Sequence, residues 1–142
     1  MLALMLSLFL MITSAFIHYE MLMHLNERLP NVTWVSRRAK VLVGVLLAIV
    51  SHALHILLYA TAYYLLRDGF RTGSFGGQFQ DVFATFFYFS AETYTSLGLG
   101  DIFPLGALRV MVGFETLTGL LMVSWTASFT YFEMSRYWEK PS

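Results

Sequence analysis

The sequence of 142 residues contains no cysteine, so it provides no disulfide and no thiolate metal ligand. Charge is also scarce: Asp, Glu, Lys and Arg make up 13% of the chain, against about 25% in average soluble domains. Nine basic residues balance nine acidic ones, and a nucleic-acid partner would require a basic patch. The chain lacks a nucleophile–base pair and a multi-ligand metal motif. We therefore expect no enzyme, no organic cofactor and no nucleic-acid partner.

Apolar residues are abundant instead, at 57% of the chain, with a mean hydropathy of +0.61. They are gathered in three blocks, 2–25, 41–66 and 105–132, and a spanning helix needs about 20 such residues. The sequence thus predicts an all-α membrane protein with three transmembrane helices. The alternative for the first block is a cleaved signal peptide, but it lacks a basic start and a clear cleavage site.

The connector 27–40 contains four of the basic residues, Arg28, Arg37, Arg38 and Lys40, against one acid. Because positive charge near membrane ends marks the cytoplasmic side, the connector is predicted to be cytoplasmic. The N-terminus then lies outside, and three crossings place the C-terminus, with the short tail 137–142, in the cytoplasm.

The segment between the second and third blocks contains an unusual glycine pattern. A glycine-containing polar loop, 67–80, is followed by a predicted short helix at about 81–93, which Asp81 would begin. That helix is too short to span, so it must enter and return. Next, 95–101 reads Thr-Ser-Leu-Gly-Leu-Gly-Asp. Glycine allows backbone conformations of either hand, so alternating glycines let successive carbonyls point to one side, and rings of carbonyls can replace the water around a cation.

Residues 90–104, read as SAETYTSLGLGDIFP, resemble the pore loop of tetrameric potassium channels, whose filter reads Thr-Val-Gly-Tyr-Gly-Asp. The resemblance extends over 41–136 and implies the pore module of the two-helix bacterial ion channels. In that module 41–66 is the outer helix, about 81–93 the pore helix, 95–101 the filter and about 105–132 the inner helix. Residues 1–26 form an additional N-terminal helix.

The resemblance implies a homotetramer in a bacterial inner membrane, because each chain has a single pore loop, with permeant potassium as its bound ligand. The ion-coordinating residues it implies are Ser96, Leu97, Gly98, Leu99 and Gly100. The residues it implies as filter support are Glu92, Thr93, Thr95 and Asp101. Asp101 would share a hydrogen bond or proton with Glu92, or would serve as a turn acid that attracts cations.

Leu99 stands where the family has a tyrosine, so it cannot donate that side chain's hydrogen bond. The outer half of the filter would then depend on packing, against Tyr88 or Tyr94. In the third block, Gly119 is a candidate gating hinge or a helix-packing residue, and packing is expected for Gly113. Glu115 is a candidate cavity-lining residue or a partner for Arg109 or a histidine.

Three functions remain open from the sequence: a potassium-preferring channel, a weakly selective sodium and potassium channel, and a non-conducting protein that binds a metal or a partner. The third would use the residues His18, Glu20, His24, His52 and His55. His52 and His55 share a helix face at i, i+3 spacing. Neutral histidines bonded to neighbouring helices are one interpretation; a metal site is another, and it would need a carboxylate such as Glu20 or Glu115.

Overall fold

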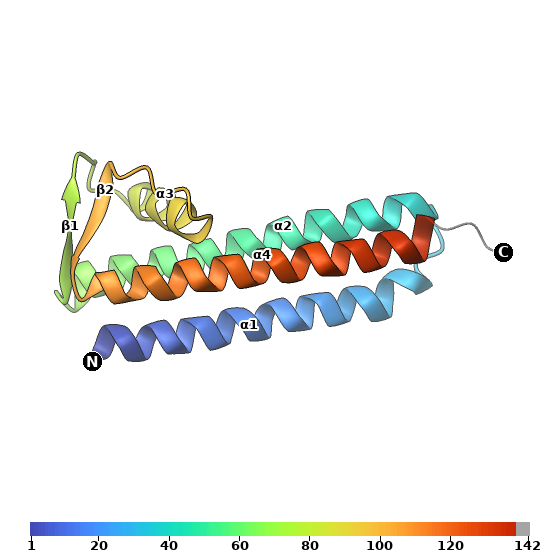
Figure 1. The fold of residues 1–142 in the computed structure, drawn as a ribbon, viewed down its shortest axis with the longest axis horizontal. Coiled ribbons are helices and arrows are strands. Elements are labelled where there is room, and N and C mark those ends of the chain that lie inside the picture. Colours follow the sequence, from blue (N-terminus) through green and yellow to red (C-terminus); the bar gives the residue numbers. More distant parts are fainter. Residues whose placement is uncertain (139–142) are drawn as a thin grey trace.

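The computed structural model describes residues 1–138 and is built on three long helices. These are α1 (Leu2–Arg28), α2 (Arg37–Tyr64) and α4 (Leu108–Trp138), each in a segment long and apolar enough to cross a membrane. They lie side by side, and the start of α1 and the end of α4 lie at opposite ends of the bundle (Figure 1). The predicted all-α membrane fold with three spanning helices is confirmed.

The connector between α1 and α2 is shorter than the sequence suggests. α1 runs on into a 3-10 turn, η1 (Leu29–Asn31), and α2 begins directly after Ser36. The Ser36 hydroxyl accepts the Ala39 N–H at 3.3 Å and so caps the new helix. The Lys40 ammonium, in the first turns of α2, donates to the carbonyl of Pro30 at 2.9 Å. These contacts hold the two helices close at this end.

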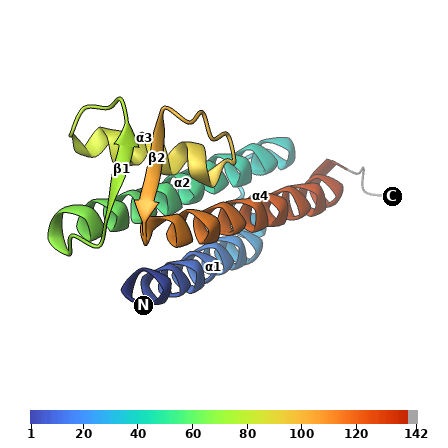
Figure 2. The same ribbon diagram turned by 60° about the vertical axis from the view of Figure 1, so that its left-hand side comes forward.

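At the other end, a re-entrant segment joins α2 to α4. A π-helical turn, η2 (Leu65–Gly69), leads to strand β1 (Gly73–Gly77), helix α3 (Phe83–Tyr94) and strand β2 (Ile102–Gly106). α3 packs on α2 and α4 on the side away from α1 (Figures 1 and 2). At 12 residues it does not cross the bundle. It begins two residues after Asp81, whose carboxylate binds a guanidinium instead of capping the helix.

The two strands pair antiparallel, with Phe75 opposite Pro104, where the sequence predicts no strand. β2 includes residues 105 and 106, which the sequence places in the inner helix; that helix begins at Leu108 instead. Three glycines in β1 and a proline in β2 hide the pairing, since both residue types are depleted in strands. The glycines have a use here, because a side chain at Gly76 would overlap the ring of Phe103. The pair ties together the two ends of the re-entrant segment.

Aromatic packing holds α3 on α2. The rings of Tyr63, Phe75 and Phe89 meet edge to face at 4.9 to 5.7 Å between centroids, and Phe86 joins them from the same helix as Phe89. Such edge-to-face pairs stabilise beyond their buried area. This cluster holds α3 on α2, and the loop follows directly from the end of that helix.

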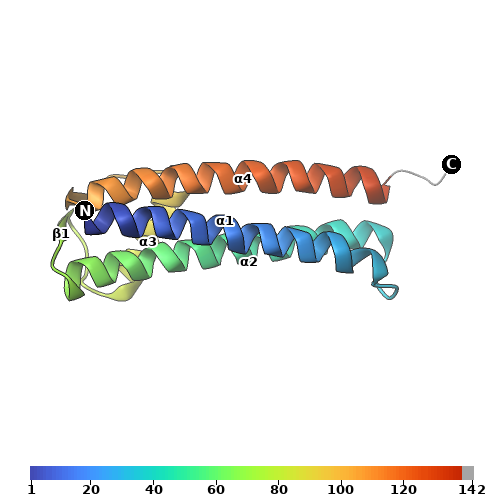
Figure 3. The ribbon, with the colours of Figure 1, turned by 90° about the horizontal axis from the view of Figure 1, so that it is seen from below.

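α1 is drawn between α2 and α4 in Figure 3, and it packs on both helices. Its buried side chains recur every three or four residues, as expected for one face of a helix; they are Ala3, Ser7, Leu10, Ser14, His18, Leu22 and Leu25. The opposite face exposes large apolar side chains such as Phe9, Ile12 and Phe16. The helix therefore presents leucines together with small and polar groups to the bundle, and exposes large apolar groups outward.

Candidate functional site

The glycine-containing loop 95–101 begins as the C-terminal cap of α3. The N–H of Ser96 donates to the carbonyl of Thr93 at 3.0 Å, and the N–H of Leu97 donates to that of Glu92 at 2.8 Å. Ser96 has φ +61°, so this is the Schellman arrangement that usually places glycine at the left-handed position. The first residues of the predicted filter thus satisfy the last carbonyls of the helix.

The remainder of the loop follows the expected alternation. φ is also positive at Gly98 (+54°) and Gly100 (+81°), but not at the leucines between them. A Cβ on either glycine would meet no other atom within 4 Å, so conformation and not space requires glycine there. The side chains of Leu97 and Leu99 are 63% and 61% exposed. Both leucines are therefore largely free of contacts with the rest of the chain.

Glu92 holds the outer half of the loop from behind. Its side chain is buried against the loop, and Oε2 accepts the backbone N–H of Leu99 at 3.1 Å. The sequence suggested that packing of Leu99 on a tyrosine would hold this half of the loop. That expectation is wrong within one chain, because Leu99 is mostly exposed and a hydrogen bond to its backbone supplies the support.

Asp101 has different partners from those expected. Its Oδ2 accepts the Tyr88 hydroxyl at 3.1 Å, and its Oδ1 accepts the N–H of Ile102 at 3.1 Å. Within residues 1–138, no hydrogen bond joins Asp101 to Glu92. Each carboxylate instead uses a donor on its own side of the loop. The expected pair is therefore replaced by two separate supports, one behind the loop and one at its outer end.

An ion pair between Arg67 and Asp81 anchors the approach to α3. Two guanidinium nitrogens of Arg67 donate to the two carboxylate oxygens of Asp81. This bidentate geometry is the strong form of the pair. The Arg67 guanidinium holds the pKa of the Asp81 carboxyl below its ordinary value.

Glu115 is buried behind α3 and does not line a cavity. Its Oε2 accepts the Tyr63 hydroxyl at 2.6 Å, and its Oε1 accepts the Ser90 hydroxyl. Ser90 also lies 2.8 Å from the carbonyl of Ile56. The suggested cavity-lining role is therefore wrong for the single chain: this carboxyl joins α2, α3 and α4. Buried polar groups need such partners because an unpaired one costs roughly 1–3 kcal/mol.

α4 also contacts the end of α3 directly. A Cβ on Gly119 would overlap the carbonyl oxygen of Tyr94, and Thr116 donates to the carbonyl of Thr93 at 3.3 Å. Gly119 thus has the packing role that the sequence left open beside a hinge. For Gly113 the expected packing is absent from the described chain, since a Cβ there meets nothing within 4 Å.

The histidines on α2 have neighbours other than the carboxylates that a metal site would need. Within residues 1–138, no group of three or more His, Asp or Glu is placed to hold an ion. Glu20 lies beside His24, and Glu115 is taken by its two hydroxyl donors. His52 and His55 instead meet His18 and a set of hydroxyls. Sequence reasoning missed Tyr63, Ser90 and Thr126 as partners, although polar residues in an apolar span are the signal for such contacts.

Comparison of the sequence with known protein families agrees with this geometry. A protein-family model described as "Ion channel" matches residues 51–134, from the middle of α2 to near the end of α4. The match includes the re-entrant segment with its glycine-containing loop and leaves α1 outside. No curated protein and no solved structure shows significant similarity to the chain.

Proposed function

The chain belongs to this ion-channel family, and from that premise we propose that it is a passive, potassium-preferring cation channel whose filter is formed by loop 95–101 from four identical chains. The observation that carries the proposal is the loop itself. Glycines at positive φ alternate with leucines, and Glu92 holds the N–H of Leu99 from behind. Ordered backbone carbonyls in such a loop can replace the hydration shell of a cation.

The arrangement of helices favours assembly around this loop. α3 and the loop lie on the side of α2 and α4 that α1 leaves free (Figure 2). The leucine side chains of the loop are exposed there. One chain has one loop and cannot enclose a pore, so identical copies would have to meet on this face. The exposed outer face of α1 would then contact lipid.

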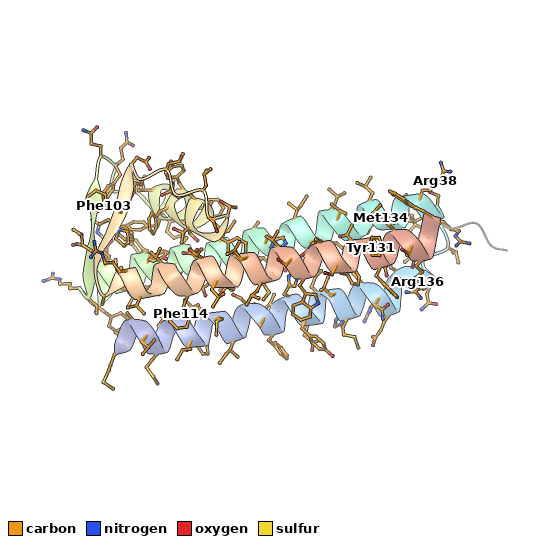
Figure 4. All side chains as sticks on the ribbon, in the orientation of Figure 1. Arg38, Phe103, Phe114, Tyr131, Met134 and Arg136 are labelled. Carbon is orange, nitrogen blue, oxygen red and sulfur yellow. The ribbon has the colours of Figure 1, made fainter. Side chains whose placement is uncertain are left out.

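The distribution of charge supports an orientation with the N-terminus outside and the C-terminus in the cytoplasm of a bacterial inner membrane. Arg38 and Arg136 mark the end of the bundle near the C-terminus, and Phe103 marks the opposite end (Figure 4). Basic residues outnumber acidic ones at the first end; they are Arg28, Arg37, Arg38, Lys40 and Arg136. At the opposite end three arginines are balanced by three aspartates (Arg67, Arg71, Arg109, Asp68, Asp81 and Asp101). Positive charge collects on the cytoplasmic side.

α4 extends to Trp138, so the proposed cytoplasmic tail, 137–142, begins within this helix; 139–142 lie outside the described residues. In this proposal the chain catalyses no reaction, and the permeant cation is its only small ligand.

The test is current through purified protein in planar bilayers under opposed potassium and sodium gradients. We expect a reversal potential near the potassium equilibrium value. A reversal potential near zero would mean that the channel is weakly selective and not potassium-preferring. Leu99 would then provide a reason, because it stands where the family has a hydroxyl-bearing tyrosine. Gly98→Ala should abolish the current because alanine is strained at φ +54°. Gly44→Ala is the matched control, since a Cβ there meets nothing and the backbone is helical. Absence of current from a confirmed tetramer would count against the proposal.

A further inference from the structure

Three of the four histidines of the chain meet inside the helix bundle. His18 is near the middle of α1, and His52 and His55 are near the middle of α2. Their ring centroids are 5.3 Å (His18–His52), 5.7 Å (His18–His55) and 6.3 Å (His52–His55) apart. His18 and His55 are completely buried. Ionisable groups inside a membrane protein are costly, and their presence points to a function.

Hydroxyl groups connect these rings into one chain of hydrogen bonds. This polar network runs in the order His55, Ser51, His18, Thr126, His52 and Tyr94. Ser51 lies 3.3 and 3.4 Å from its two histidines, and Thr126 lies 3.0 and 3.1 Å from its two. The last contact, from His52 Nδ1 to the Tyr94 hydroxyl, is 2.9 Å. The network therefore joins α1 to α2, α4 and the last residue of α3.

The hydrogens of the neutral network can fill all five contacts in two opposite ways. A neutral imidazole has one N–H and one acceptor nitrogen, and a hydroxyl both donates and accepts. If His55 donates to Ser51, every following group donates onward, and His52 donates to Tyr94. If Tyr94 donates to His52, every group donates the other way, and His55 receives a hydrogen bond at Nε2. Neither arrangement leaves a contact empty.

One additional proton also fits without loss of a contact. When His18 is doubly protonated it donates to both Ser51 and Thr126, and these hydroxyls donate onward to the outer two rings. An imidazolium at His52 or His55 is accommodated in the same way. His55 Nδ1 is buried and has no partner, so one end of the network has an open position. A second proton would place two cations about 5–6 Å apart in apolar surroundings, where their repulsion is strong.

No fixed charge in the surrounding helices competes for this proton. On α1, Glu20 lies beside His24 at the exposed surface. α2 carries no acidic or other basic side chain over 41–66. On α3, Glu92 is directed at the loop, and on α4, Glu115 is held by its two hydroxyl donors. Among the described residues, the network therefore consists only of imidazoles and hydroxyls.

We propose that the polar network is a binding site for a single proton inside the helix bundle, shared between α1, α2, α4 and the last residue of α3. With the proton bound, the Tyr94 hydroxyl can only accept a hydrogen bond from His52, whereas in the neutral network it can either donate or accept. Tyr94 is the last residue of α3, and its carbonyl contacts α4 at Gly119. The site thus links proton uptake to the base of loop 95–101. The proton count itself holds whether or not ions cross the loop.

The test is solid-state NMR of protein labelled with 15N-histidine in phosphatidylcholine bilayers, titrated from pH 8 to pH 4. We expect the three imidazoles of the polar network to take up one proton per chain in a single shared step, beside a separate signal from exposed His24. His24→Gln is the matched control and should remove only the separate signal. His18→Gln should abolish the shared step, because an amide can hydrogen-bond there but cannot titrate, and the two remaining histidines should respond independently.

Three independent protonation steps in the unmodified chain would overturn the proposal, and so would no uptake by the network down to pH 4. Because neither readout depends on current, a chain that fails to conduct counts against the proposed function alone. A proton count other than one counts against the site alone. Current measured across the same pH range then shows whether conduction changes when the network takes up its proton.

Discussion

Alanine at two glycines of the same helix, α4, should have opposite effects on stability. Replacing a helical glycine by alanine favours the helix by about 0.8–1.0 kcal/mol when nothing else changes. Gly113 meets this condition, since its Cβ would contact nothing within 4 Å. At Gly119 the new methyl would overlap the carbonyl oxygen of Tyr94, a backbone atom that can move only with the end of α3.

The magnitudes can be compared directly. Overpacking of this kind costs about 1–3 kcal/mol, so the helix gain leaves Gly119→Ala destabilised by roughly 0–2 kcal/mol. Gly113→Ala should be stabilised by about 1 kcal/mol. The two variants are therefore expected to differ by about 1–3 kcal/mol. Equilibrium unfolding in mixed micelles with increasing sodium dodecyl sulfate, followed by far-ultraviolet circular dichroism, measures this difference.

A hinge at Gly119 makes a different prediction. If the glycine served only to bend α4, both alanines would favour the helix equally, and the two unfolding free energies would rise together. Only the current through Gly119→Ala would then change. Equal stabilities for the two variants would refute the packing argument, and a higher stability of Gly119→Ala would refute it more strongly.

Three further substitutions test the loop and its approach. Ser96→Gly should stabilise the chain by about 0.5–1 kcal/mol in the same unfolding assay. The left-handed conformation costs serine about 1–2 kcal/mol, and glycine avoids this cost. Part of the benefit is offset because glycine loses more conformational entropy on folding. Glu92→Ala should move the reversal potential toward zero, whereas Glu92→Gln, which keeps an acceptor for the N–H of Leu99, should retain most of the selectivity. Arg67 lowers the folded-state pKa of Asp81 below its unfolded value of about 3.9. The unmodified chain should therefore be more stable than Asp81→Asn by a constant amount above pH 5, and this difference should shrink as the pH falls below about 4. A difference that does not change with pH would contradict this.

Elements that depend on local pattern could be predicted from the sequence. The three spans follow from long apolar blocks, and the re-entrant helix follows from a segment too short to cross a membrane. The positive φ at Gly98 and Gly100 follows from the residue type. The remaining features depend on contacts distant in sequence. Nothing near β1 shows that it pairs with β2, because glycine and proline are both poor indicators of strands.

The partners of the acidic side chains were the least predictable part of the site. A resemblance suggests that Glu92 and Asp101 pair, but a backbone N–H and a tyrosine hydroxyl take their places in this chain. Glu115 could equally have faced a cavity, since periodicity does not reveal which neighbouring helix supplies the donors. The burial of the side chain determines which partner it has, because a carboxyl inside the bundle must lie within hydrogen-bond distance of donors such as hydroxyls.

The buried polar contacts also show that α1 is part of the same structural unit as the channel-like segment. A helix as short as α3 is marginal by itself, and here buried polar side chains hold it at Ser90, Thr93 and Tyr94. α1 is connected to this contact indirectly: His18 bonds to Thr126, which also bonds to His52, the partner of Tyr94. Without His18 the network is cut between Ser51 and Thr126, and each hydroxyl loses a buried partner. α2 and α4 hold α3 and the base of loop 95–101 directly, and α1, outside the family-matched region, is connected to them through the polar network.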